Sequence, residues 1–422
     1  MDVDRPGRPY GNVVVVGAGQ AGGDLVAHLR EAEFEGAITL IGSEHSVPYS
    51  RPPLSKAYLL GKKSRSDLLL RSADTYERFG IAVHDAEVES IDRARKRISI
   101  SGGQHLDYDT LVLATGGRAR SYPGGELVKA SNVHYLRTLE DADKLRPHLV
   151  QGARMTVIGG GYIGLEVAAV ASSLGVQTTI VEREQRLLAR VTSGVTSSFF
   201  ARVHGEAGTR VLTGRSVAEF DVSDDRVASL TLDDGTTIET DLCLVGIGLE
   251  PDVGLAEACG LTTDDGVVVD HLLRTDDPSI FAIGDVARHP CAEVGGTRRL
   301  ESIPNCSEQA RALAQTLVGN PTPYTAVPWF WSDQFDLKLQ VVGLSRPEDE
   351  VITRGDPTRD RSISVFYLRD GRVRAAEVVS NPRDFAVAKK MVTERVMVDP
   401  QLLGNPSLPL KEIFEAARAQ AV

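Results

Sequence analysis

The chain has few cysteines, and none of them is spaced for chemistry. Its 422 residues include four, and these form no C-x-x-C or C-x-x-x-x-C pair and accompany no histidine cluster. The sequence therefore supports neither a redox dithiol nor a zinc or other metal site. We expect the cysteines to be small buried residues in a reducing compartment; they are Cys243, Cys259, Cys291 and Cys306.

Long apolar runs and an excess of positive charge are also missing. The chain has no stretch of about 18 apolar residues that could span a membrane. Its first residues, Met1–Arg5, are charged, unlike those of a signal peptide. The 47 basic and 58 acidic side chains give a net charge of −11, which argues against a nucleic-acid partner. We expect a cytoplasmic protein that does not bind a membrane.

What the chain does contain is one glycine-rich signature in two copies. Each copy is a β-branched run that ends in G-x-G-x-x-G and leads into a helix-compatible stretch. The first glycine permits the tight turn, the second lets the backbone approach a pyrophosphate, and the third lets helix and strand pack. A single copy also occurs in ordinary turns, but two in matching context predict two bound dinucleotides. The glycines are Gly17, Gly19 and Gly22 in the first copy and Gly159, Gly161 and Gly164 in the second.

Acidic residues after the loops bear on which dinucleotides are bound. Glu182 ends the strand after the second loop, where a carboxylate accepts hydrogen bonds from the adenosine ribose. It would repel a 2′-phosphate, which favours NADH over NADPH, although Arg183 and Arg190 lie nearby. After the first loop the corresponding strand ends at Ser43 and Glu44, and either residue is a candidate for the ribose contact.

The order of the expected elements predicts an α/β protein with two Rossmann-like dinucleotide-binding domains. Each glycine loop opens a βα unit, and each unit closes with a buried strand and a glycine turn, near residues 117 and 248. From about residue 329, both tryptophans, alternating strands and a helical tail indicate a smaller α+β C-terminal domain.

One segment between these regions carries a further signature. The string from Arg274 to Asp285, which ends in Phe-Ala-Ile-Gly-Asp, resembles the flavin-binding fingerprint of two-dinucleotide flavoproteins, whose final aspartate binds the ribityl chain of FAD. The alternative is a strand that enters a turn with an N-cap aspartate. The two upstream loops favour the flavin and imply that this segment returns to the first domain. We therefore predict a discontinuous FAD-binding domain at 1–118 and 250–328, an NAD-binding domain at 119–249 and a C-terminal domain at 329–422.

Longer strings carry a closer resemblance to a known family. The strings are Arg51–Lys56, Tyr135–Ala142, Gly160–Glu166, Glu301–Asn305 and Pro328–Gln334. In them the chain resembles the oxygenase-coupled NADH-dependent ferredoxin reductases, which have a glutathione reductase-like fold. The resemblance places an acidic ribose ligand where this chain has Ser43, and it implies FAD contacts at Ala21, Lys56, Val88, Arg137, Asp285 and Ile303. Further cofactor contacts are predicted at Arg51, Ala114, Thr115, Ile163, Gly248 and Trp331.

The resemblance also implies two catalytic residues. Lys56 would lie beside the flavin and pair with Glu166. A cation there would stabilise the electron-rich reduced ring, and the glutamate would orient the lysine. Outside the family context, a solvated lysine and a helix-surface carboxylate are the preferred interpretations.

Electrons must then leave the flavin without the help of a cysteine. Disulfide reductases and peroxidases of similar architecture use cysteines near the first βα unit, where this chain has Ser50 and Ser55 and no cysteine before Cys243. A two-iron, two-sulfur ferredoxin that serves a haem monooxygenase or a ring-hydroxylating dioxygenase fits as acceptor. The alternatives are a rubredoxin reductase, an NADH oxidase or, less in keeping with an acidic chain, an NADH-sensing flavoprotein resembling apoptosis-inducing factor.

An acidic ferredoxin would need a basic docking patch despite the overall negative charge. The candidates are Arg71, Arg311 and Lys338, each of which is individually more typical of a solvated side chain. We expect the protein to be a monomer or a weak dimer.

Overall fold

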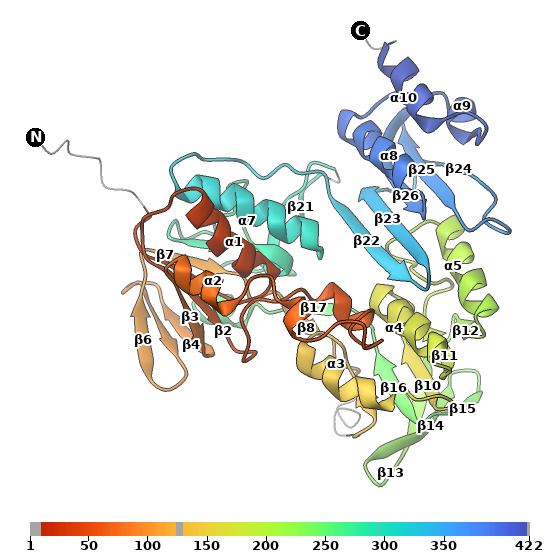
Figure 1. Cartoon of the computed structure of the whole chain (residues 1–422), viewed down its shortest axis with the longest axis horizontal. Helices are drawn as coiled ribbons and strands as arrows, with labels where there is room; N and C mark the ends of the chain where they lie inside the picture. Colours follow the sequence, from red (N-terminus) through yellow and green to blue (C-terminus); the bar gives the residue numbers. More distant parts are fainter. Residues whose placement is uncertain (1–9, 124–129, 294, 420–422) are drawn as a thin grey trace, which may run out of the picture. The chain divides into compact units, whose positions relative to one another are not determined.

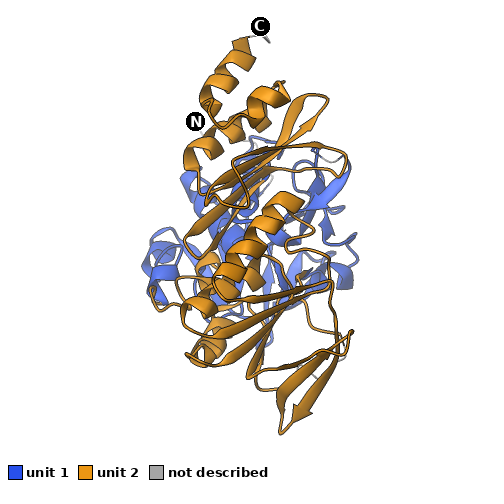
Figure 2. Ribbon diagram, turned by 90° about the vertical axis from the view of Figure 1, so that its right-hand side faces the viewer, with its two compact units in different colours: residues 1–50, 65–118, 250–328 blue, residues 51–64, 119–249, 329–422 orange. Residues whose placement is uncertain are grey.

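The computed structural model describes residues 10–123, 130–293 and 295–419 (Figure 1). The charged residues 1–5 lie outside these ranges. Contacts divide the chain into two units, which Figure 2 shows in different colours. The first unit consists of residues 1–50, 65–118 and 250–328, and the second of residues 51–64, 119–249 and 329–422. The three domains expected from the sequence stay a prediction.

The first unit is built on a five-stranded parallel sheet. Across the sheet its strands are β19 (Ile280–Ala282), β7 (Thr110–Leu113), β1 (Val13–Val16), β2 (Ile38–Gly42) and β3 (Ile81–Asp85). The four valines of β1 are all buried, as expected for a central parallel strand covered on both faces. Helices α1 (Gln20–Glu31) and α7 (Ile303–Leu317) lie side by side in this unit (Figure 1). Because β19 pairs with β7, the fingerprint segment returns to the first sheet.

Smaller elements complete the first unit. One antiparallel sheet holds β4 (Val88–Asp92), β5 (Arg97–Ile100) and β6 (Gln104–Asp107), and another small sheet holds β18 (Val267–Val268), β20 (Ala287–Pro290) and β21 (Thr297–Arg299). The short helices are α2 (Ala73–Arg78), α6 (Gly254–Ala258), η2 (Ser66–Leu68) and η5 (Gly284–Val286). Two of the places where the chain passes from one unit to the other lie in short strands, β8 (Gly117–Ala119) and β17 (Leu249–Pro251).

The second unit contains a parallel sheet of the same kind. Across the sheet its strands are β12 (Arg210–Thr213), β11 (Gln177–Glu182), β10 (Arg154–Ile158), β16 (Leu242–Val245) and β9 (Val133–His134). Its helices are η1 (Pro52–Ser55), α3 (Leu139–Leu145), η4 (Arg146–His148), α4 (Tyr162–Ser173) and α5 (Gly194–Glu206), and a side sheet holds β13 (Val217–Ser223), β14 (Arg226–Leu232) and β15 (Thr237–Glu239). The two parallel sheets confirm the predicted α/β class.

The C-terminal part of the second unit is an antiparallel sheet with three helices. Across the sheet its strands are β22 (Trp329–Gln334), β23 (Leu337–Gly343), β26 (Arg372–Val379), β25 (Ile363–Arg369) and β24 (Glu350–Arg354). The helices are α8 (Pro382–Glu394), α9 (Pro400–Gly404) and α10 (Leu410–Ala419). Strand β22 packs against α4, with the rings of Phe330 and Tyr162 4.4 Å apart, so this sheet contacts the helix that follows the second glycine loop. Among the described residues, no helix combines the length and the apolar character needed to cross a membrane.

Candidate functional site

The first glycine loop joins β1 to α1 where only glycine fits. Gly17 has a φ of +113°, and a Cβ atom on it would lie 2.1 Å from the carbonyl oxygen of Ala114. A Cβ atom on Gly22 would lie 2.0 Å from the carbonyl oxygen of Gly17. Helix and strand therefore touch through their backbones. Gly19 is the N-cap of α1 and brings no capping side chain.

The second glycine loop repeats this geometry between β10 and α4. Gly159 has a φ of +110°, and a Cβ atom on it would lie 2.4 Å from the carbonyl oxygen of Gly246. A Cβ atom on Gly164 would lie 2.3 Å from the carbonyl oxygen of Gly159. The N-cap is again a glycine, Gly161, without a side-chain hydrogen bond.

The two helices after these loops begin differently from other long helices of the chain. The N-caps of α5, α7 and α8 are Ser193, Ser302 and Asn381, and each side chain accepts a backbone N–H of the first turn. In α1 and α4 no side chain does so, and neither helix has an acidic residue in its first turn. The first N–H groups and the positive end of each helix dipole thus remain for an anion. These residues fit the pyrophosphate groups of FAD at the first loop and of a nicotinamide dinucleotide at the second.

Glu182 lies directly against the second glycine loop. Its Oε2 accepts the backbone N–H of Gly160 at 2.5 Å, and its Oε1 accepts that of Glu184 at 2.7 Å. Both bonds fix the carboxylate at the end of β11, where an adenosine ribose is bound in folds of this type.

The two arginines near Glu182 have different surroundings. Arg183 is exposed and forms an ion pair with Glu184 at 3.2 Å, which opposes its charge. Arg190 lies beside the predicted cofactor residue Gly248, since a Cβ atom on that glycine would lie 3.7 Å from the Nη2 atom of Arg190.

The ribose contact of the first loop stays open between two residues. Ser43 and Glu44 follow β2, and both are exposed. Glu44 accepts a hydrogen bond from the hydroxyl of Tyr49. This bond holds the Glu44 carboxylate close to the end of the strand, where Ser43 also stands.

The fingerprint aspartate stands at the beginning of α1. Gly284 has a φ of +78°, and a Cβ atom on it would lie 2.8 Å from the Cβ of Ala21. The structure thereby brings together Ala21 and the neighbouring Asp285, whose Oδ1 lies 3.6 Å from the Sγ of Cys306. The N-cap of η5 is Ile283, and Asp285 is inside the turn, so the N-cap interpretation of this aspartate is wrong.

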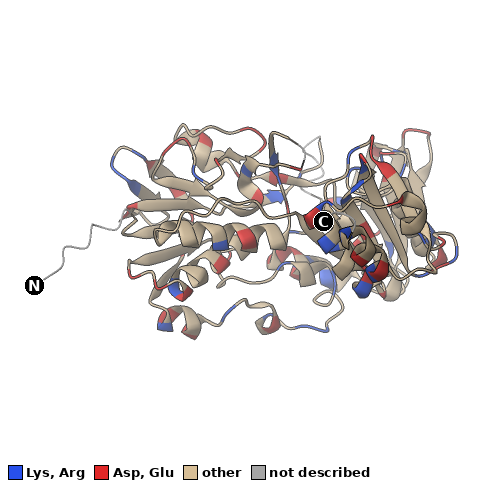
Figure 3. Ribbon diagram, turned by 90° about the horizontal axis from the view of Figure 1, so that it is seen from above, with Lys and Arg blue, Asp and Glu red and all other residues tan. Residues whose placement is uncertain are grey.

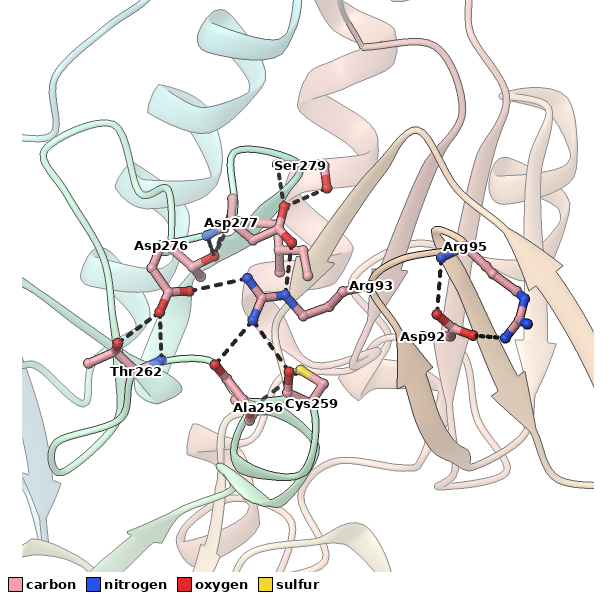
Figure 4. A network of polar contacts seen from close by, with 12 residues as sticks. Asp92, Arg93, Arg95, Ala256, Cys259, Thr262, Asp276, Asp277 and Ser279 are labelled. Carbon is pink, nitrogen blue, oxygen red and sulfur yellow. Dashed lines mark hydrogen bonds and ion pairs between the residues drawn. The ribbon is translucent and has the colours of Figure 1, made fainter.

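An arginine that the sequence did not single out holds the loop before β19 (Figure 4). The Nε of Arg93 donates to Asp277 at 2.9 Å, and its Nη2 lies 3.8 Å from the Oδ1 of Asp276. Burial alone would raise the pKa of Asp277, but hydrogen bonds from Ser279 and Arg93 outweigh it and keep the pKa below its ordinary value. The Thr275 hydroxyl closes the same loop by donating to the Ile280 carbonyl at 2.9 Å. These bonds fix the strand that leads to the fingerprint aspartate.

The other predicted cofactor residues of the first unit lie at element ends. The carbonyl of Ala114, just after β7, faces the first glycine loop. Thr115 follows it, and its hydroxyl donates to the carbonyl of Asp252 at 2.7 Å. Val88 opens β4 and is buried, and Ile303 opens α7.

The ion pair expected between Lys56 and Glu166 is formed in the second unit. Nζ of Lys56 lies 2.6 Å from Oε2 of Glu166, and their side chains are 17% and 2% exposed. The ammonium also donates to the carbonyl of Pro52 at 3.1 Å. Because both side chains are largely buried, each charge depends on the other for compensation. Lys56 is therefore not a solvated lysine, and Glu166 is not a carboxylate on the surface of its helix.

Two serine hydroxyls complete the surroundings of Glu166. Ser55 donates to Oε2 at 2.5 Å, and Ser332 of β22 donates to Oε1 at 2.6 Å. The sequence reasoning missed both contacts. Ser55 is adjacent to Lys56, but no local pattern relates Ser332 to a glutamate more than a hundred residues earlier.

Four further predicted residues lie in the second unit. Nη1 of Arg51 donates to the carbonyl of Arg137 at 2.9 Å, so these two are brought together. Trp331 is half-buried, with its ring 5.7 Å from that of Trp329. Ile163, in the first turn of α4, is 43% exposed, which leaves an apolar surface beside the glycine loop.

The predicted cofactor-binding and catalytic residues are thus divided between the units. The first unit holds Gly17, Gly19, Ala21, Gly22, Ser43, Glu44, Val88, Ala114, Thr115, Asp285 and Ile303, and the second holds Arg51, Lys56, Arg137, Gly159, Gly161, Ile163, Gly164, Glu166, Glu182, Gly248 and Trp331. Their roles toward bound cofactors stay predictions.

Family models and named relatives match most of the chain. Residues 11–310 match the family described as pyridine nucleotide-disulphide oxidoreductase, and residues 329–414 match the reductase C-terminal family. The chain is 44% identical to putidaredoxin reductase CamA of Pseudomonas putida over 97% of its own length and 98% of that protein. It is 39% identical to the ferredoxin–NAD(+) reductase component of the p-cumate 2,3-dioxygenase system of Pseudomonas putida, over 96% of its length and 99% of that protein.

A solved structure agrees with these matches. The crystal structure of the covalent putidaredoxin reductase–putidaredoxin complex superposes with a TM-score of 0.94 at 44% identity, over 97% of this chain and 99% of that one.

Proposed function

This chain belongs to the pyridine nucleotide-disulphide oxidoreductase family and, within it, to the ferredoxin reductases of oxygenase systems, and from that membership we propose that it carries electrons from NADH through FAD to a two-iron, two-sulfur ferredoxin. The ferredoxin would serve a haem monooxygenase or a ring-hydroxylating dioxygenase. The observation that carries the proposal is the pair of glycine loops, each followed by a helix without a side-chain cap, in a chain without a cysteine pair.

Within this proposal the two glycine loops and four predicted side chains have defined tasks. FAD, when bound, accepts a hydride from NADH and returns its two electrons singly. The first glycine loop and Asp285 would hold FAD, and the second loop with Glu182 would hold NADH. Lys56 would supply positive charge to the reduced ring, and Glu166 would keep the ammonium in place.

The burial and the unpaired state of the cysteines support direct transfer of electrons from the flavin to the acceptor, without a thiol as carrier. None of the four forms a disulfide in the described chain, and Cys243, Cys291 and Cys306 are buried. Burial raises the pKa of the Cys243 thiol to about 12, so that it is not a thiolate near neutral pH. Unpaired cysteines also fit the reducing conditions of a cytoplasm, where we place the protein.

The acceptor distinguishes this function from its alternatives. NADH oxidation should be fast with ferricyanide or a two-iron, two-sulfur ferredoxin and slow with oxygen alone. Rapid NADH consumption with oxygen alone would indicate an oxidase, and a preference for rubredoxin would indicate a rubredoxin reductase.

A protein without its cysteines should still turn over. Serine at positions 243, 259, 291 and 306 removes every thiol from the chain. We expect ferredoxin reduction to change less than about threefold, because buried hydroxyls affect stability more than chemistry. Steady-state kinetics of the fourfold variant, compared at equal FAD content, measure this. Loss of activity in a variant that keeps its FAD would show that a thiol carries electrons.

The nucleotide preference should depend on Glu182. Replacement by alanine removes a charge that repels a 2′-phosphate and is expected to narrow the NADH preference by about 1–3 kcal/mol in the ratio of kcat/KM values. The control is Glu219→Ala, which removes an equally negative but exposed side chain of β13. Equal kcat/KM values of the natural protein for NADH and NADPH would refute the assignment.

Three basic residues were predicted to dock an acidic ferredoxin. They differ in whether a neighbouring acid already opposes their charge. Lys338 pairs with Asp333 at 2.8 Å, and Arg71 lies 3.8 Å from Asp24. Arg311 is exposed on α7 and forms no ion pair within the described part of the chain. Basic and acidic residues are interspersed along the ribbon (Figure 3). Docking of an acidic partner would therefore depend on a few cations that no neighbouring acid opposes, and not on the net charge. We propose Arg311 as the principal contact and a monomer or weak dimer as the active species.

A further inference from the structure

Glu166 is held by donors on both of its oxygens, and they come from different elements. Oε2 accepts Nζ of Lys56 at 2.6 Å and Oγ of Ser55 at 2.5 Å, both from the segment 51–64. Oε1 accepts Oγ of Ser332 at 2.6 Å, from the first strand of the C-terminal sheet. Ser332 is completely buried, and Glu166 is 2% exposed. No solvent is at hand to replace a missing donor.

Behind Ser332 the hydrogen bonds continue in one direction. Nε2 of Gln334 donates to Oγ of Ser332 at 3.3 Å, which leaves the hydroxyl proton of the serine for Glu166. The Oε1 of Gln334 lies 3.0 Å from Nε2 of His204 on α5, so this ring nitrogen is the donor. Burial keeps the pKa of His204 below its ordinary value, and its Nδ1 has no partner among the described residues, as in a neutral Nε2–H ring.

We infer that Ser332 is a positioning residue, which fixes the carboxylate of Glu166 through its hydroxyl and thereby fixes the ammonium of Lys56. The C-terminal sheet then contributes to the reaction through this hydroxyl. The inference rests on the proposed function in so far as Lys56 serves the flavin.

Ser332 can position the ion pair because the Glu166 carboxylate accepts hydrogen bonds on both of its oxygens. With Ser332 on Oε1 and Ser55 on Oε2, the carboxylate plane has one orientation, and the Lys56 ammonium is directed by Oε2 and by the carbonyl of Pro52. Without the Ser332 hydroxyl the carboxylate can turn about its Cγ–Cδ bond and leave the ammonium several positions. Electrostatic stabilisation by a fixed charge is lost steeply when the charge is no longer preorganised.

The test compares Ser332→Ala with Ser197→Ala in the FAD-loaded protein. Ser197 is an equally buried serine of the second unit, and its hydroxyl donates to the Leu187 carbonyl at 2.6 Å instead of to the ion pair. For Ser332→Ala we expect a more negative flavin midpoint potential and a kcat for ferricyanide reduction lower by about tenfold, with the KM for NADH within about twofold. Ser197→Ala should change neither the potential nor kcat.

Two further variants keep the inference falsifiable. Ser332→Thr retains the hydroxyl and should restore most of the potential and of kcat, whereas Gln334→Met removes the next donor and should act like Ser332→Ala with a smaller effect. If Ser332→Ala does not fold, the flavin potential and kcat of Gln334→Met test the inference in its place. Potentials and rates that match those of Ser197→Ala would overturn the inference, as would a folded Ser332→Thr variant that behaves like Ser332→Ala. The potential is measured by dye equilibration without NADH or ferredoxin, so an error in the proposed acceptor would not alter this result.

Discussion

Replacement of Lys56 by methionine is expected to make the flavin midpoint potential more negative and to slow flavin reduction by NADH on the order of 100-fold. Methionine keeps most of the length of the unbranched side chain and removes its charge, so the electron-rich reduced ring loses its nearest proposed cation. FAD should remain bound, because the first glycine loop and Asp285 are untouched. Stopped-flow absorbance at the flavin band measures the rate, and dye equilibration measures the potential.

A loss of stability must be separated from this loss of chemistry. Removing Lys56 leaves the Glu166 carboxylate buried without its cation, which costs about 3–5 kcal/mol when a buried pair is broken. The double variant Lys56→Met/Glu166→Gln removes the uncompensated charge and should recover stability without recovering the potential. Lys62→Met, an exposed lysine of the same segment, should leave both properties unchanged. An unchanged potential and rate in Lys56→Met would return Lys56 to a purely structural role.

The glycine loops could be predicted because their causes are local. Gly17 and Gly159 both need a positive φ and both face a carbonyl oxygen at a distance that no side chain tolerates. This requirement is visible in the sequence because the glycines directly follow a β-branched run that forms the strand. The same holds for Glu182, whose position at the end of β11 follows from the length of the βαβ unit.

The surroundings of the ion pair could be predicted only in part. Lys56 and Glu166 were found through strings shared with a family, and the structure joins them. Ser332 and Gln334 lie on the strand that also carries both tryptophans. No periodicity in the sequence relates these two polar residues to Glu166. Contacts of this kind depend on how separate elements pack, which a single sequence does not state.

Arg93, which holds the loop before β19, is a second contact that could not be predicted from the sequence. Arg93 follows β4, and its partners Asp276 and Asp277 lie in the loop before β19. In the sequence it is one of 47 basic residues, in an ordinary hairpin turn. Only the return of β19 to the first sheet brings its partners within reach.

Reversal of the charge at Arg311 is expected to raise the KM for ferredoxin by about tenfold and to leave reduction of ferricyanide by NADH intact. The guanidinium is exposed and is not opposed by an ion pair in the described chain, so its replacement by glutamate turns attraction toward an acidic partner into repulsion. The KM of the natural protein for ferredoxin should rise with salt, and that of Arg311→Glu should rise less, because screening weakens an attraction that the variant has already lost.

A matched exposed cation and the two assays together make this result specific. Lys96→Glu changes the charge by the same amount at an exposed turn between β4 and β5 and should leave the KM for ferredoxin within about twofold. Ferricyanide is small and needs no protein docking surface, so its reduction reports on NADH and flavin alone. If Arg311→Glu impairs both assays equally, Arg311 serves the fold or the flavin. If Lys96→Glu raises the KM as much as Arg311→Glu does, the ferredoxin responds to net charge and not to a patch on α7.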